Sequence, residues 1–213
     1  SSGSVVNSDL WQWDGETWSN ATPQVGVTPG ARRLHSMAFD SDRNAAIIFG
    51  GFNNGALNDL WEWTGSQFVP QPPTSGAPAA RLASTLAYDA THLKLTMFSG
   101  LATQNANSTL NDLWEWSGGI WQQQTSTGVT PAARGYAASI FEPMAGGLLM
   151  FGGSRGNELF DDLWLLANGS WSRVNVNNAR PSARTQHAMA YDSGRGRTVL
   201  FGGSSSSNLP ETW

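Results

Sequence analysis

Residues 46–63 read Ala-Ile-Ile-Phe-Gly-Gly-Phe-Asn-Asn-Gly-Ala-Leu-Asn-Asp-Leu-Trp-Glu-Trp. The segment starts with an apolar run that ends in a glycine doublet, and it finishes with Asp-Leu-Trp-Glu-Trp after a short polar stretch. The apolar run does not alternate with polar residues, which predicts a strand that is covered on both faces. Asn and Gly between the two parts are typical of a turn. The segment therefore predicts two neighbouring strands joined by a loop.

Similar sequence motifs recur along the whole chain, so the chain consists of repeated units. The first tryptophan of the closing motif recurs at intervals of 50, 53, 50 and 49 residues, at Trp11, Trp61, Trp114, Trp164 and Trp213. A Pro-x-Ala-Arg motif lies between successive copies, and it begins at Pro29, Pro78, Pro131 and Pro181. A doublet of small residues follows 21 positions after each of these prolines: Gly50-Gly51, Ser99-Gly100, Gly152-Gly153 and Gly202-Gly203. A period of about 50 residues is typical of an array of small structural units.

Each unit divides into four short strands. The first is rich in Ala and Ser, the second is the apolar run, the third carries the tryptophans, and the fourth carries one aromatic residue. Small sheets that stack face to face around an axis would cover both faces of the second strand, and this arrangement is a β-propeller. We therefore expect one apolar residue in each second strand to be inaccessible to solvent: Ile48, Met97, Leu149 and Leu200.

This combination of an apolar strand, a glycine doublet and a Trp-rich strand resembles the kelch repeat, in the divergent form found in bacterial proteins. The resemblance implies an all-β, kelch-like β-propeller with four blades' worth of four-stranded antiparallel sheets in one domain, residues 1–213. The units are roughly 28–70, 77–122, 130–172 and 180–213, the last completed by residues 7–20.

The two ends of the chain carry competing third strands. We expect Asp9–Trp13 to pair with Thr198–Gly203 and close the last blade, either within one chain or from a neighbouring copy. The terminal residues Glu211–Trp213 would then compete for the same edge or lie outside it. Open blade edges make self-association an expectation as well.

Composition excludes several classes of function. The chain has no Cys, which excludes disulfides, thiolate metal sites and the Cys-linked Tyr of kelch-fold copper oxidases. A net charge of −4 argues against a nucleic-acid partner, and the apolar runs are too short for membrane insertion. Low Lys and abundant Ser, Thr and Asn favour an extracellular or cell-surface protein. The opening Ser-Ser-Gly-Ser, without Met, indicates a processed, cut or tagged chain.

Four arginines recur just before the first strand of each unit, at Arg32, Arg81, Arg134 and Arg184, and Arg33 is an additional one. One hypothesis is a ring of guanidinium groups at the channel mouth that binds an anionic group. The alternative is that each Arg ties its blade to a neighbouring carbonyl or acid. The repeated acids are interpreted as turn or edge-strand residues. His35, His92 and His187 do not form a convergent set, so no metal is expected, nor any other cofactor.

The connections between second and third strands vary most in length and sequence. They span Phe52–Leu57, Leu101–Leu110, Ser154–Phe160 and Ser204–Leu209, and all are expected on one face. Loops on a rigid scaffold usually carry binding function, although solvated filler is the alternative interpretation. The ligand-binding candidates in these loops are Asn53, Asn54, Asn105, Asn107, Arg155 and Asn157.

The leading functional hypothesis is a non-enzymatic interaction module that presents one face to a protein or extracellular partner. The first alternative is a glycan-binding module in which a sugar ring stacks on exposed Trp13, Trp63 or Trp116. The second is an enzyme with its site at the channel mouth, although no cluster of acids, His and Tyr stands out from the repeat to supply catalytic residues.

Overall fold

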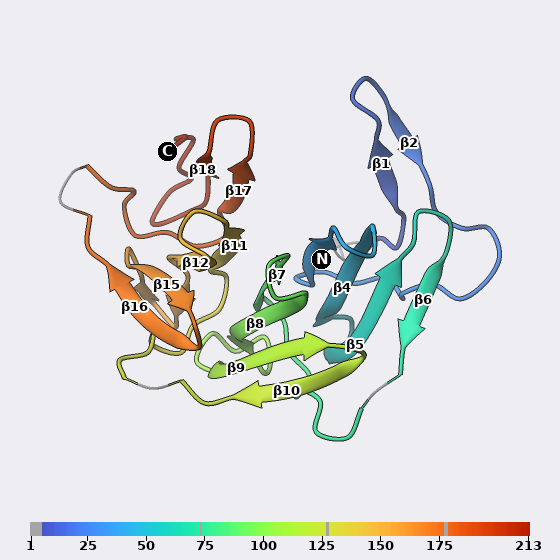
Figure 1. The fold of residues 1–213 in the computed structure, drawn as a ribbon, viewed down its shortest axis with the longest axis horizontal. Coiled ribbons are helices and arrows are strands. Elements are labelled where there is room, and N and C mark those ends of the chain that lie inside the picture. Colours follow the sequence, from blue (N-terminus) through green and yellow to red (C-terminus); the bar gives the residue numbers. More distant parts are fainter. Residues whose placement is uncertain (1–5, 73, 127, 177–178) are drawn as a thin grey trace.

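The structure is a computed structural model that describes residues 6–72, 74–126, 128–176 and 179–213. All regular elements in these residues are β-strands, and no helix occurs among them. Figure 1 shows small sheets that follow one another around an axis as a ring, which is open between β17–β18 and the β1–β2 hairpin. The expected all-β, kelch-like propeller architecture is confirmed. Residues 1–5 of the expected domain lie outside the described residues.

Three blades are complete four-stranded antiparallel sheets. The first blade contains β3 (Ser36–Asp40), β4 (Ala45–Phe52), β5 (Ala56–Trp63) and β6 (Phe68–Gln71). The second blade contains β7 (Thr85–Asp89), β8 (Lys94–Leu101), β9 (Thr109–Ser117) and β10 (Ile120–Gln124). The third blade contains β11 (Ala138–Glu142), β12 (Gly147–Phe151), β15 (Leu163–Ala167) and β16 (Ser170–Val174).

The remaining strands form two-stranded sheets. They are the fourth blade, β17 (Ala188–Asp192) with β18 (Arg197–Phe201); the N-terminal hairpin, β1 (Trp11–Trp13) with β2 (Trp18–Asn20); and a small hairpin in the third blade, β13 (Ser154–Arg155) with β14 (Glu158–Leu159).

The first strand of each blade lies nearest the axis, where β3 contacts β7, β7 contacts β11, and β11 contacts β17. Small residues permit this approach: the hydroxyl of Ser36 lies 2.8 Å from that of Ser84 across the first junction. Just before these strands, backbone amides link one blade to the next. Ala83 donates to the Leu34 carbonyl (2.8 Å), and Tyr136 donates to the Ala83 carbonyl (3.0 Å). The inner wall is therefore a continuous series of backbone contacts.

The small-residue doublets follow the apolar run of each second strand, and in the first two blades they shift the strand register, as between Phe49 and Gly51. Gly51 has a φ of 100°, and a Cβ there would lie 2.8 Å from the carbonyl oxygen of Arg33. A side chain is therefore excluded on both conformational and steric grounds. Ser99 replaces the first glycine in the second blade at a φ of 65°, and its hydroxyl donates to the carbonyl of Leu110 at 2.7 Å. The hydrogen bond explains why serine is tolerated there.

Burial of the second strands follows the prediction in most blades. Ile48, Met97 and Leu200 are buried, whereas Leu149 is only half-buried, so the expectation for Leu149 is wrong. The fourth blade departs further, because Phe201 is 57% exposed. A second strand is covered on both faces only where blades lie on both sides of it, and the fourth blade is at one end of the ring.

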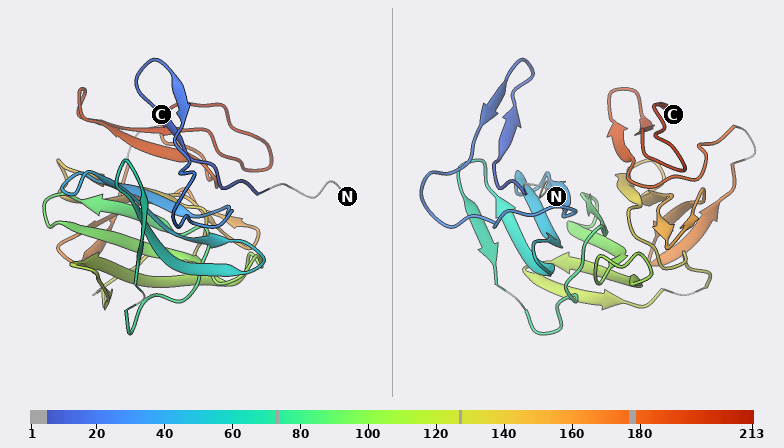
Figure 2. Two further views of the ribbon diagram at one scale, coloured as in Figure 1. Left: turned by 90° about the vertical axis from the view of Figure 1, so that its right-hand side faces the viewer. Right: turned by 180° about the vertical axis from the view of Figure 1, so that it is seen from behind.

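Closure of the fourth blade by residues 7–20 is not confirmed. Within the described residues β1 pairs with β2, and these two strands form a sheet of their own. The third-strand position beside β18 is occupied by the C-terminal segment instead: Leu200 and Trp213 exchange backbone hydrogen bonds of 3.0 and 2.9 Å. Figure 2 shows the β1–β2 hairpin at the opposite side of the ring opening from β17–β18.

Candidate functional site

Each of the four repeated arginines connects several strands of its blade, and we call these residues the arginine nodes. In the third blade, Arg134 donates from Nη1 and Nη2 to the two carboxylate oxygens of Asp162, at 2.5 and 2.9 Å. Its Nη1 also donates to the carbonyl of Gly152 (3.0 Å), and its Nε donates to Ala132 (2.9 Å). Trp164 Nε1 donates to the same carboxylate at 2.6 Å. One guanidinium group thus joins the start of the first strand, the end of the second and the start of the third.

An Arg–acid ion pair recurs in every unit, with two hydrogen bonds to the carboxylate in the first three blades and one in the fourth. The four ion pairs are Arg32–Asp59, Arg81–Asp112, Arg134–Asp162 and Arg184–Glu211. Burial would raise the pKa of Asp59, Asp112 and Asp162, but hydrogen bonds from the paired Arg and Trp, together with the charge of the Arg, hold each pKa below its usual value. These carboxylates therefore stay ionised and paired at neutral pH.

The arginine nodes do not form an exposed anion-binding ring. The side chains of Arg81, Arg134 and Arg184 are 0–1% exposed, and that of Arg32 is nearly as buried. Their donors are directed to carbonyls and acids of the same blade, which corresponds to the structural interpretation. The hypothesis that these four side chains contact a ligand directly is therefore wrong for the described structure.

Arg33 differs from its neighbour because it is exposed and sits beside a variable loop. Its backbone forms a bridge with Phe52, and its guanidinium lies 5.6 Å from the centre of the Phe52 ring. The other units have Leu82, Gly135 and Thr185 at this position. Arg33 thus adds a positive charge to the loop face of the first blade alone.

The variable connections are short, ordered extensions of the blades. In the first blade the strands continue to Phe52 and resume at Ala56, with Asn53 and Asn54 exposed between them. The second-blade loop is fixed from within: Ala102 donates to the carbonyl of Ser108 (2.9 Å), and Asn107 donates to the side chain of Asn105 (2.9 Å). Asn105 and Asn107 remain exposed.

The loops of the second and third blades touch. Gly156 donates its backbone N–H to the carbonyl of Ala106 at 2.9 Å. The adjacent Arg155 and Asn157 are exposed, and Arg155 forms an ion pair of 2.7 Å with Glu158. The six loop candidates and Arg33 are therefore all solvent-accessible. We call the exposed surface of residues 33, 53–54, 103–107 and 155–158 the loop rim.

The histidines have structural environments. Burial, followed by the charge of Arg184, lowers the pKa of His187 to about 4, and its ring packs edge-on against Phe151 with centroids 5.6 Å apart. Partial desolvation of its ring, followed by the charge of Arg32, lowers the pKa of His35, although the residue as a whole is exposed. His92 contacts Asp89 at 2.7 Å in the turn between β7 and β8. Among the described residues, no three His, Asp or Glu side chains are placed to hold a metal ion.

The tryptophans proposed for sugar stacking are mostly in the core. Trp63 and Trp116 are buried and present no face for sugar stacking, whereas Trp13 is half-exposed on the N-terminal hairpin. Trp114 and Trp164 are buried, whereas their counterpart Trp11 is 50% exposed. The exposed tryptophans follow from the open ring, because no blade covers the hairpin.

The turns on the opposite rim contain local ion pairs. Asp40 accepts the backbone N–H of Arg43 at 3.0 Å and its Nε at 2.7 Å. A cavity of ≈ 230 Å³ lies on this side between the second and third blades. Two charged side chains that line it, Lys94 and Glu115, are already paired at 2.7 Å.

Sequence reasoning missed the partners of the arginines. The acids before each third strand were interpreted as turn or edge residues, but they are the counter-ions of the arginine nodes. A signal was present: acid follows arginine by 27, 31, 28 and 27 residues in the four units. The spacing between each arginine and its acid therefore changes with the length of the variable connection between the second and third strands.

Comparison with known families gives one finding. Residues 1–203 match the sequence model of the KLHDC2/KLHL20/DRC7 Kelch-repeats domain. No curated protein matches the chain. The structure contains no helix in its described residues that could cross a membrane.

Proposed function

The chain belongs to the family of Kelch-repeat domains, which generally mediate protein–protein interactions, and we propose that it binds a protein partner through its loop rim without catalysing a reaction. The observation that carries the proposal is the ordered, exposed and non-repeating character of this rim. Differences in length between the repeat units are concentrated in these connections.

The chemistry of the rim suits a polar partner surface. Asn53, Asn54, Asn105, Asn107 and Asn157 each present an amide that can both donate and accept hydrogen bonds. Amides of this kind can pair with the backbone or polar side chains of a partner. The internal hydrogen bonds of residues 102–108 fix the loop before binding, so little conformational entropy is lost on association.

Arg33 and Arg155 supply the positive charge of the rim. Arg155 forms an ion pair with Glu158, and Arg33 lies over the Phe52 ring at the edge of the first blade. A partner with an acidic side chain next to a polar segment would complement this distribution. The composition favours an extracellular setting for the interaction, as noted above.

The proposal is tested by comparing two sets of substitutions in the same protein. The rim variant carries Asn53→Ala, Asn105→Ala, Asn157→Ala and Arg33→Ala. The control variant carries Met144→Ser and Arg195→Ala on the opposite rim, where both residues are largely exposed.

Each immobilised variant is exposed to extracts and medium from the source cells, and retained proteins are quantified by mass spectrometry. We expect proteins retained by the wild type and the control variant to be lost from the rim variant. Retention that is unchanged by the rim substitutions, or that is lost only with the control, would refute the proposal.

A further inference from the structure

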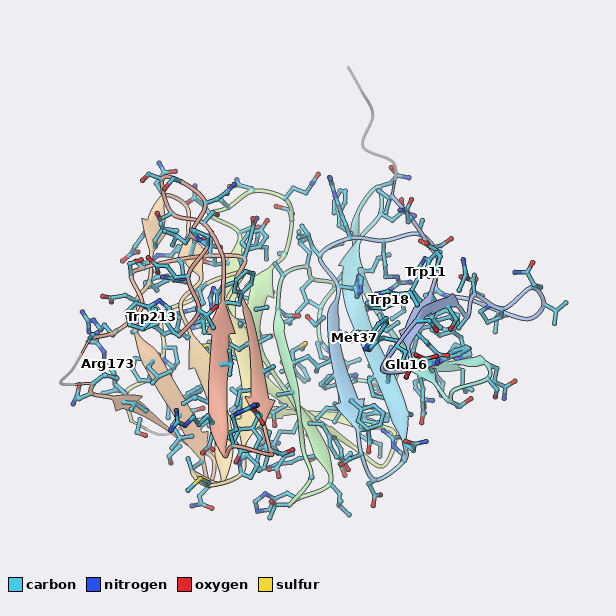
Figure 3. The ribbon with its side chains drawn as sticks, turned by 90° about the horizontal axis from the view of Figure 1, so that it is seen from above. Trp11, Glu16, Trp18, Met37, Arg173 and Trp213 are labelled. Atoms are coloured by element: carbon cyan, nitrogen blue, oxygen red, sulfur yellow. The ribbon has the colours of Figure 1, made fainter. Side chains whose placement is uncertain are left out.

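The cavity of ≈ 230 Å³ on the opposite rim lies at the second junction, between the second and third blades. Both blades are complete four-stranded sheets. Figure 3 shows the green strands of the second blade between the end of the ring that carries Trp11 and the end that carries Trp213. The cavity therefore lies within the array of blades and does not depend on how the ends of the ring are arranged.

Two differences between the repeat units open this cavity. At the first junction, between the first and second blades, the guanidinium of Arg43 lies 4.5 Å from the centre of the Trp116 ring. At the second junction His92 takes the position of Arg43 in the turn after the first strand. Leu166 takes the position of Trp116 on the facing third strand. Both replacements line the cavity, and this smaller pair does not close the junction as the stacked Arg and Trp do.

The cavity reaches a wall that the first junction keeps covered. A cavity of ≈ 240 Å³ at the first junction is lined by Arg43 and Trp116 but not by Glu62 on the third strand of the first blade. Glu115, the counterpart of Glu62 in the second blade, lines the cavity at the second junction. The stacked pair thus separates the inner wall from the rim at the first junction, and the second junction leaves this wall accessible.

The wall formed by the second blade is also more polar than its counterpart. Lys94 and Thr96 stand at the positions that Ala45 and Ile47 occupy in the first blade, where both belong to the apolar core. Leu148 of the third blade keeps part of the lining apolar. A concave, partly apolar site with a few convergent polar groups is typical of a small-ligand pocket.

The carboxylates that hold Arg43 recur around the cavity. At the first junction, Nε of Arg43 donates to Asp40 at 2.7 Å, and Nη1 lies 3.7 Å from Glu62. The corresponding acids at the second junction are Asp89 and Glu115, and both line the cavity. The surroundings of a guanidinium group are therefore repeated at a junction that has no arginine in the Arg43 position.

These two carboxylates favour a cationic ligand. Lys94 pairs with one oxygen of Glu115 at 2.7 Å, and among the described residues it is the one side chain that donates to this carboxylate. His92, which is charged only when protonated, lies 2.7 Å from Asp89. A carboxylate can accept about four hydrogen bonds, so both acids retain acceptor capacity beside a single ammonium group.

We propose that this cavity binds a guanidinium group in the place that Arg43 holds at the first junction. The planar group donates to Asp89 and Glu115, and the alkyl chain that carries it lies on Leu148 and Leu166. Pockets for drug-sized ligands have volumes of about 300–1,000 Å³, so the bound group is smaller than such a ligand. The site is separate from the loop rim and does not rest on the function proposed for it.

The probe is n-butylguanidine, which is added to the isotope-labelled full chain while amide chemical shifts are recorded. We expect saturable shifts at residues 89–94 and 146–148, which surround the cavity, and none in the loop rim. n-Butylurea has nearly the same shape without the charge and is expected to bind at least about tenfold more weakly. The blocked tripeptide acetyl-Gly-Arg-Gly-amide carries the same group on a polypeptide. The tighter of the two guanidinium probes identifies the source as a free small molecule or as an arginine side chain.

Two matched comparisons test the position of the ligand. His92→Arg combined with Leu166→Trp rebuilds the stacked pair of the first junction and is expected to abolish binding. Thr91→Arg adds the same charge at an exposed neighbour that does not line the cavity, and it should weaken binding far less. Glu115→Gln is expected to weaken binding at least about tenfold, whereas Glu62→Gln makes the same change at the first junction and should leave affinity unchanged.

The amide spectrum of each variant also reports whether it is folded. If the rebuilt variant does not fold, the comparison of Glu115→Gln with Glu62→Gln decides the position of the ligand. Absence of saturable shifts around the cavity, or equal affinity for n-butylguanidine and n-butylurea, would overturn the proposal. Binding that is unchanged in the folded rebuilt variant, or equally weakened by the two Glu→Gln changes, would overturn it as well.

Discussion

The arginine nodes predict a large difference between two chemically similar substitutions. Asp162→Asn removes the negative charge opposite Arg134, whose side chain is 1% exposed. Glu211→Gln makes the corresponding change opposite Arg184, but the Glu211 side chain is 46% exposed and accepts a single hydrogen bond from the guanidinium. The two substitutions therefore remove the same charge from sites of different burial and geometry.

The expected magnitudes follow from this contrast. In Asp162→Asn one of the two carboxylate acceptors of Arg134 becomes an NH2 donor and the other becomes neutral, so the guanidinium stays buried without a counter-charge, which costs about 3–5 kcal/mol of unfolding free energy. Water reaches the Glu211 carboxylate and can take over its hydrogen bond to Arg184, so Glu211→Gln should cost much less unfolding free energy than Asp162→Asn. Adding Arg134→Met to Asp162→Asn removes the orphaned cation, so the double variant should be less destabilised than the sum of the single variants.

Urea unfolding followed by tryptophan fluorescence and far-UV circular dichroism measures these differences. The transition midpoint should fall in Asp162→Asn with an unchanged slope. Equal destabilisation by the two substitutions, or a cost below about 1 kcal/mol for Asp162→Asn, would refute the assignment of the arginines as the ties that hold each blade together.

Three further outcomes are expected. Because the pKa of His187 is lowered to about 4, the unfolded chain binds more protons than the folded chain between pH 6.5 and about 4. The free energy of unfolding should therefore fall by at most about 3 kcal/mol as the pH is lowered through this window. His187→Ala should flatten the pH profile of the melting temperature. Met97→Ala should cost about 2–5 kcal/mol in urea unfolding because Met97 is fully buried, whereas Met37→Ala should cost far less at an exposed site; similar losses would contradict the blade packing. Gly153→Ala should destabilise more than Gly169→Ala in the same assay, because both have positive φ but only a Cβ at Gly153 meets a carbonyl oxygen, that of Gly135 at 2.7 Å.

The repeat itself was predictable because its physical requirements are local. Positive φ and close backbone approach demand small residues at the doublets, and stacked sheets demand an apolar second strand. These constraints act in every unit and therefore produce a periodic sequence pattern. The same reasoning failed at Leu149, because its burial depends on the blade beside it, and β17 and β18 form only a two-stranded sheet there.

The end of the ring was not predictable in this way. Asp9–Trp13 and Glu211–Trp213 carry equivalent motifs, and periodicity alone does not rank them for the edge of β18. The C-terminal segment reaches this edge through a short connection, whereas the N-terminal segment would close a loop of nearly the whole chain, which costs more entropy. In the structure the local segment occupies the edge.

The candidate site was predictable only in part. Variation in the loop lengths identified the loop rim, and its Asn residues are exposed as a binding surface requires. The sequence left the role of the arginines open, because a guanidinium group can contact a ligand or form buried hydrogen bonds within its own blade. Burial decides between these roles, and burial comes from the packing of the loops around the arginines.

Hydrogen–deuterium exchange of the protein with and without a partner retained through the loop rim tests the central claim most directly. We expect slower exchange at residues 102–108 and 154–159 in the complex, with unchanged exchange in the turns at residues 41–44 and 143–146 of the opposite rim. Protection confined to those turns, with no change at residues 102–108 and 154–159, would contradict the account.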